Sequence, residues 1–219
     1  ESGKVVWRKD LLEEYGIRMP IWGIAASPIV FGDLVIVQIG GASACLVAFD
    51  RRTGKEKWRT LDDRASYSTP LIIEQNGQTV LVCWTGDHVV GLDPHSGQVH
   101  WKYPHPPKEM VISIASPVVE DDRLFVTNFF DGSLMLRLLS DRLAVEKIWR
   151  RAGSSELQTD GLHSTITTPL IIGDLIYGID SYGEFRGLNA ATGQRNAVAV
   201  GPMVAAGVLV NLGRAAKFP

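Results

Sequence analysis

Short apolar runs alternate with short polar turns along most of the chain. Four of these runs begin at a proline that follows Ser or Thr, namely Pro28, Pro70, Pro117 and Pro169. A polar turn and a second apolar run follow each proline, with the second runs at 34–38, 79–84, 124–128 and 175–180. Val, Ile, Phe and Tyr dominate these runs, and no long segment shows the 3.6-residue period of a helix. The pattern predicts an all-β protein built from short strands.

A second motif follows each pair of runs and ends, in most copies, in tryptophan. Its first copy is Ala48–Trp58, in which Asp50 precedes Gly54 by four residues. The later copies carry the anchors Asp93, Gly97 and Trp101, then Asp141 and Trp149, then Asn189 and Gly193. The third copy has Ala144-Val145 in place of Thr-Gly, and the fourth has Ala197 in place of Trp. The Asp or Asn anchors are 43, 48 and 48 residues apart, a period typical of propellers, solenoids or arrays.

Each repeat therefore contains four predicted strands, which is the content of one β-propeller blade. We expect four-stranded antiparallel blades at approximately 27–60, 69–103, 116–150 and 168–195. The Asp-x-x-Thr-Gly string predicts a tight turn, because glycine adopts positive φ and the short polar side chain binds local backbone. The tryptophan after the turn is then placed to pack against a neighbouring blade.

Both ends of the chain carry part of the same pattern. Ser2–Trp7 aligns with Thr53–Trp58, so residues 3–8 are predicted to be the last strand of a preceding blade. In the tail 196–219, the apolar strings at 202–204 and 207–210 echo the start of a blade, but the tail has no acidic residue. It is either the start of a further blade or a stretch unrelated to the propeller. The expected architecture is four full blades plus partial blades at both ends.

The full motif at Ala48–Trp58 resembles the tryptophan-docking motif of PQQ-like (quinoprotein-type) β-propeller repeats, and the resemblance covers residues 1–195. It assigns a structural docking role to Trp7, Asp50, Gly54, Trp58, Asp93, Gly97, Trp101, Asp141, Trp149, Asn189 and Gly193. Propellers of this family have seven or eight blades, so the resemblance implies an incomplete ring of about half that number. It also implies a periplasmic or otherwise extracytoplasmic location, with the export signal outside this chain. A cytoplasmic location is the alternative.

Composition and charge narrow the classes of function. The 22 basic and 24 acidic residues leave a net charge of −2, so no basic footprint indicates nucleic-acid binding. No apolar run approaches the roughly 18 residues of a membrane-spanning helix. Cys45 and Cys83 lie in apolar runs of different blades and are predicted to be buried thiols.

The candidate site residues lie in the loops that join one blade to the next Pro-led strand, because loops on a rigid scaffold commonly carry function. The candidates on this face are Trp22, Arg64, Tyr67, Asp160, His163 and Ser164. The Asp-x-x-His-Ser string has the residue types of a general base or ligand group, and equally those of a turn or cap. Trp22 and Tyr67 fit the floor of a ligand pocket and also ordinary packing. No residue is predicted to be catalytic.

Enzymes of the quinoprotein family use pyrroloquinoline quinone (PQQ) and calcium, and one branch adds a disulfide between adjacent cysteines. No cysteine here has a cysteine neighbour, so we predict no cofactor and no metal. The resulting hypothesis is a non-catalytic binding or scaffold module of a larger bacterial protein, with a protein partner or small ligand on the propeller face. The resemblance supports it, since non-catalytic relatives include the lipoprotein that assists outer-membrane protein assembly. The alternative is a fragment of a PQQ- and calcium-dependent dehydrogenase that oxidises alcohols or sugars.

Overall fold

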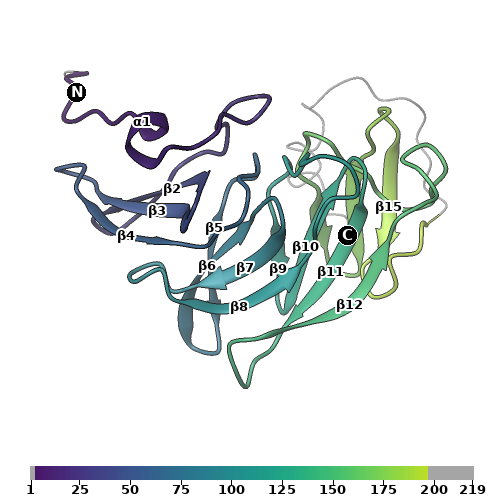
Figure 1. The fold of residues 1–219 in the computed structure, drawn as a ribbon. Coiled ribbons are helices and arrows are strands. Elements are labelled where there is room, and N and C mark those ends of the chain that lie inside the picture. Colours follow the sequence, from purple (N-terminus) through teal and green to yellow (C-terminus); the bar gives the residue numbers. More distant parts are fainter. Residues whose placement is uncertain (1–2, 197–219) are drawn as a thin grey trace. The chain divides into compact units, whose positions relative to one another are not determined.

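The computed structural model describes residues 3–196, and the tail predictions for 197–219 lie outside that range. The chain divides into two compact units. The first unit consists of Glu1–Ile114 and Ser140–Ala144, and the second of Ala115–Leu139 and Val145–Pro219. Figure 1 labels strands of both units.

The first unit contains two four-stranded antiparallel sheets in which each strand pairs with the next along the chain. The strands of its first sheet are β1 (Ile29–Phe31), β2 (Leu34–Gly41), β3 (Ala44–Asp50) and β4 (Glu56–Thr60). Those of its second sheet are β5 (Leu71–Gln75), β6 (Gln78–Trp84), β7 (His88–Leu92) and β8 (Val99–Pro104). Each sheet is the simple meander expected of a propeller blade (Figure 1).

The second unit repeats this meander. Its first sheet has the strands β9 (Val118–Glu120), β10 (Arg123–Asn128), β11 (Gly132–Leu138) and β12 (Val145–Arg151). Its second sheet has the strands β13 (Leu170–Ile172), β14 (Leu175–Ile179) and β15 (Phe185–Asn189). Where a fourth strand was expected, the described residues show only an isolated bridge between Leu188 and Arg195, because the rest of that segment lies outside the described range.

The N-terminal segment differs from its prediction. Residues 3–8 belong to none of the four sheets, because an outer strand forms only against the third strand of its own blade and none lies beside them in the described chain. The sequence also did not predict the short helix α1 (Leu11–Tyr15). Asp10 caps it by accepting hydrogen bonds from the amides of Leu12 and Glu13, and Gly16 ends it at φ 57°.

The core of each unit lies between its own two sheets. In the first unit, Ile36 and Leu46 of one sheet belong to the same buried cluster as Leu81 and Val90 of the other. In the second unit, the corresponding cluster joins residues of β10, β11 and β12 to residues of β14 and β15, namely Phe125, Met135, Trp149, Ile176 and Leu188. The apolar runs recognised in the sequence therefore supply both cores.

Three tryptophans make the same contact with a repeat that follows them. The indole Nε1 donates to the carbonyl just after the Asp or Asn anchor, from Trp7 to Arg51, Trp58 to Pro94 and Trp149 to Ala190, at 2.8, 3.1 and 2.8 Å. Each ring also lies against the motif glycine: a Cβ on Gly97 would lie 2.6 Å from the ring of Trp58. Glycine is required at position 97 for two reasons: a Cβ would overlap the indole ring, and φ is +74°.

Trp101 makes a different contact, because the third repeat lacks the Thr-Gly turn. Its Nε1 donates to Oε1 of Gln75 at 2.9 Å. The amide nitrogen of Gln75 then donates to the carbonyl of Ala144 at 2.7 Å, so a glutamine side chain bridges the tryptophan and the altered loop. The anchor turn itself is well defined in the first repeat, where hydrogen bonds from the Thr53 side chain and backbone lower the pKa of Asp50 to about 2.

Candidate binding site

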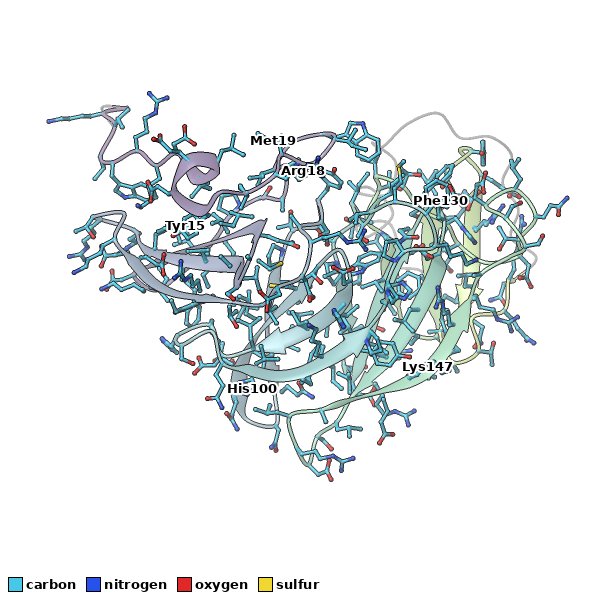
Figure 2. The ribbon with its side chains drawn as sticks, viewed as in Figure 1. Tyr15, Arg18, Met19, His100, Phe130 and Lys147 are labelled. Atoms are coloured by element: carbon cyan, nitrogen blue, oxygen red, sulfur yellow. The ribbon has the colours of Figure 1, made fainter. Side chains whose placement is uncertain are left out.

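The first unit has a surface hollow of about 540 Å³ formed by three loops. The segment after α1 supplies Arg18, Met19, Pro20, Ile21 and Trp22, the β4–β5 loop Arg64, Ala65 and Tyr67, and the segment after β8 Glu109, Met110 and Val111. Ile39 and Gly40, at the end of β2, complete the lining. Arg18 and Met19 are labelled on the loop beyond α1 in Figure 2.

The repeat explains why these loops contribute together. Trp22, Arg64 and Val111 each lie six residues before the proline that opens the next sheet, and all three line the hollow. Consecutive blades thus present equivalent loop positions to one place on the first unit. Sequence inspection selected Trp22, Arg64 and Tyr67 from two of these loops but missed the contribution of residues 109–111.

Apolar side chains are unusually exposed around the hollow. The exposed fractions are 51% for Met19, 76% for Ile21, 54% for Trp22 and 39% for Met110. The Trp22 and Tyr67 rings meet edge to face with their centroids 5.6 Å apart, and Tyr67 is nearly buried. Large apolar side chains gathered at one exposed place are typical of interaction surfaces.

The hollow also carries charge. Arg64 makes a two-point contact with Asp87, with Nη2 at 2.6 Å and Nε at 3.1 Å from the same carboxylate oxygen. Although burial raises the pKa of Asp87, the hydrogen bonds and charge of Arg64 outweigh it, so the pKa lies below its ordinary value. Within the described residues, Arg64 Nη1 has no hydrogen-bond partner, and Arg18 and Glu109 form no ion pair.

The other three candidates lie in the second unit. His163 and Ser164 are fully buried, with Nδ1 of His163 2.7 Å from the carbonyl of Phe129 and Oγ of Ser164 donating to the carbonyl of Ile179 at 2.7 Å. Asp160 is exposed, with a carboxylate oxygen 4.0 Å from Arg151. The His and Ser side chains thus face the interior and bond to backbone, while Asp160 faces solvent.

Residues 3–196 hold no group of three or more His, Cys, Asp or Glu side chains placed to bind a metal ion. Among the same residues, no helix has both the length and the apolar character needed to cross a membrane. Cys45 and Cys83 are free, buried thiols, and burial raises the pKa of both.

The fold and the repeat pattern can be compared with known proteins. A family model described as outer membrane protein assembly factor BamB matches residues 1–197. The chain belongs to this BamB family. The BamB of Shewanella oneidensis is 22% identical in an alignment of 204 residues that covers 88% of this chain and 49% of that protein. The chain therefore spans about half the length of this curated relative.

Solved structures agree on the fold. The crystal structure of BamB from Moraxella catarrhalis matches with a TM-score of 0.55 and 24% identity, over 79% of this chain and 52% of that one. This match confirms the predicted all-β propeller architecture, and the family model confirms the PQQ-like repeat. A europium-containing methanol dehydrogenase matches over 79% of this chain and 41% of its own at 13% identity, but its TM-score of 0.46 is too low to carry an argument.

Proposed function

We propose that this BamB-family chain is a non-catalytic binding module that acts outside the cytoplasm in outer-membrane protein assembly. We further propose that it holds a protein partner at the hollow lined by Trp22, Arg64 and Tyr67. The observation that carries the proposal is the cluster of exposed Met19, Ile21, Trp22 and Met110 side chains around that hollow. Family membership supports the biological setting, since the relatives are named as assembly factors.

The chemistry of the hollow suits a polypeptide segment with apolar side chains. A volume of about 540 Å³ accommodates a few side chains rather than a whole domain. Met19 and Met110 are flexible and polarizable, so they adapt to side chains of different shape. Tryptophan, tyrosine and arginine are the residues that most often dominate protein–protein binding energy, and this hollow has one of each from the candidate set.

The alternative cofactor-dependent function fits this site less well. A calcium ion takes six to eight oxygen ligands, several of them carboxylates in most sites. The lining of the hollow offers a single carboxylate, that of Glu109. These residues do not fit the PQQ and calcium site of the dehydrogenases.

Site-specific photo-crosslinking of the full parent protein in its own cells tests the proposal. A photoreactive phenylalanine analogue at position 22 is expected to form one dominant protein adduct, identified by mass spectrometry. The same analogue at position 78, exposed in the β5–β6 hairpin at the other end of the strands, is the matched control. Equal adducts at both positions, or none at 22, would reject the hollow as the binding site.

A dye-linked dehydrogenase assay separates the two functions. With PQQ and calcium added, the parent protein is expected to oxidise no alcohol or aldose. Turnover that depends on both additions would favour the quinoprotein alternative.

A further inference from the structure

Two dipeptides of the first unit face each other next to the hollow. Asp63-Arg64 belongs to the β4–β5 loop. Asp87 lies in the turn between β6 and β7, and His88 is the first residue of β7. Their side chains form crossed pairs: Arg64 binds Asp87, and Nδ1 of His88 lies 2.9 Å from Asp63. We call these four residues the crossed clasp.

The acidic residue at the inner end of the crossed clasp is deeply buried. Asp63 is only 6% exposed and has three side-chain partners. Besides His88, the hydroxyl of Thr85 donates to it at 2.6 Å and the ammonium of Lys102, on β8, at 2.8 Å. A buried carboxylate is costly unless it is paired and hydrogen-bonded, and here both conditions are met.

The backbone of Arg64 is fixed from both sides. Its amide donates to Oδ2 of Asp87 at 2.9 Å, and its carbonyl accepts from the amide of Gly86 at 2.8 Å. Asp87 also holds the Nε and Nη2 edge of the guanidinium. What remains available on Arg64, at the lining of the hollow, is Nη1, a donor for a carbonyl or carboxylate of a bound segment.

The second unit shows that the fold does not require the buried acid. His163 occupies the loop position of Arg64, six residues before the proline, and its amide likewise donates to an aspartate, Asp180. The position before it, equivalent to Asp63, is the fully buried Leu162. A leucine serves the same place in this blade, so the loop backbone forms there without a buried acid.

We infer that Asp63 is a positioning residue: through the crossed clasp it holds Arg64 in the orientation that presents Nη1 to a hydrogen-bond acceptor of the bound partner. The binding role of Arg64 rests on the proposed function. The positioning itself is a property of the free protein and can be measured without a partner.

Arginine labelling with phenylglyoxal, followed by peptide mass spectrometry, measures that positioning on the whole chain. The variant Asp63→Leu installs the residue of the second unit at this position. It is expected to raise the labelling rate of Arg64 about three- to tenfold, because the guanidinium leaves Asp87 more often. Exposed Arg52 and buried Arg186 are internal standards whose rates should not change.

Two further variants keep the test decisive. Asp63→Asn keeps one acceptor but no charge, and is expected to give an intermediate rate, so it replaces Asp63→Leu if that variant fails to fold. Asp62→Asn is the neighbouring control, because the Asp62 carboxylate binds Ser43 and, among the described residues, forms no hydrogen bond or ion pair with the crossed clasp. An unchanged Arg64 rate, or a rise shared by Arg186, would overturn the positioning role.

The outcomes separate this inference from the proposed function. If Asp63→Leu accelerates Arg64 labelling but position 22 forms no adduct, the positioning stands and the binding site falls. If the adduct forms in wild type and survives in Asp63→Leu at equal yield, the hollow binds a partner without the crossed clasp, and the part of the inference in which Arg64 is presented to the partner falls.

Discussion

The β4–β5 loop of the first unit and the β12–β13 loop of the second unit share one backbone scheme. In both, the amide six residues before the proline donates to an aspartate of the adjacent hairpin, Arg64 to Asp87 and His163 to Asp180, each at 2.9 Å. In both, a serine hydroxyl of the loop donates to the last carbonyl of a central strand, from Ser66 to Trp84 and from Ser164 to Ile179.

The side chains carried by this shared scheme go opposite ways. The Arg64 side chain is 55% exposed and lines the hollow, whereas His163 has no exposed surface and binds the carbonyl of Phe129. Phe129 lies in the β10–β11 hairpin. Its ring packs edge to face against Phe130, and its centroid is 6.1 Å from that of Tyr182. The comparison teaches that the blade fixes the loop backbone, while the residue at this position and its neighbours decide whether its side chain lines a hollow or fills the interior.

Exchanging the two residues gives the largest expected effect. His163→Arg places a larger, charged group in a fully buried position where the carboxylate of Asp180 is already paired with Arg186, and we expect a loss of about 3–5 kcal/mol in the free energy of unfolding. Arg64→His removes only an exposed ion pair and should cost about 1 kcal/mol or less. Chemical denaturation of both variants measures the difference. Equal losses would mean that the two loops are alike in burial, contrary to the structure.

A glycine under His163 provides a second, smaller test. Gly132 has φ +70°, and a Cβ there would lie 2.2 Å from the carbonyl oxygen of Arg151 and 2.9 Å from Nε2 of His163. Gly132→Ala should therefore cost about 2–4 kcal/mol, from backbone strain and overlap together.

Gly77 is the matched control for that substitution. It has φ +67° in the β5–β6 hairpin, with nothing within 4 Å of an added Cβ. Gly77→Ala should cost about 1–2 kcal/mol, the strain of positive φ alone. Thermal unfolding of both variants isolates the close approach at Gly132, to the Arg151 carbonyl and to His163 together, and similar melting temperatures would contradict that close packing.

Much of this fold follows from sequence because two motifs recur in phase. A proline-led strand, repeated four times, and an anchor turn, intact in three of the four repeats, indicate the strand order and the sheet boundaries through short-range chemistry. Gly97 and Gly193, for instance, adopt the positive φ that the turn demands. Two features were not predicted from the sequence. One is the short helix capped by Asp10, and the other is the Gln75 side chain, which bridges Trp101 to Ala144 where the third repeat lacks the anchor turn.

The candidate site was predictable only in part. Its loop positions follow from the repeat, and counting six residues back from each proline finds Trp22, Arg64 and Val111 together. The same count selects His163, whose side chain turns inward, because the direction of a side chain depends on neighbours such as Phe129 that are distant in sequence. The exposed Met110 was missed since a single apolar residue in a Pro-rich loop resembles ordinary loop sequence.

Truncation of the hollow should barely change stability. Trp22→Ala and Arg64→Ala remove exposed groups, so we expect each to lower the free energy of unfolding by about 1 kcal/mol or less. Under the proposed function, Arg64→Ala abolishes most of the partner adduct at position 22, while Arg52→Ala, an exposed arginine outside the hollow, leaves it intact. A large loss of stability in Arg64→Ala would instead assign Arg64 to the scaffold, as His163 is.

The smallest expected effect is a difference in the pH at which the two aspartates, Asp87 and Asp180, are protonated. The contacts of Arg64 outweigh burial and lower the pKa of Asp87 below 3.8, so its stabilising contribution is present above pH 3.8 and is lost as the pH falls through the lower folded value. Burial raises the pKa of Asp180 above 3.8, so its contribution is favourable below pH 3.8 and is lost as the pH rises through the raised value.

As the pH falls from 7, Asp180 therefore takes up its proton before Asp87 does. Amide proton shifts followed by NMR should move at His163 with a midpoint above pH 3.8, and at Arg64 with a midpoint below it. The amide of Thr192 is the internal control, because its acceptor is the non-titrating side chain of Asn189 at 3.0 Å. A common midpoint for both loops would show that the two aspartates sit in equivalent surroundings, and the contrast between an open and a filled loop would then have to rest on Arg64 and His163 alone.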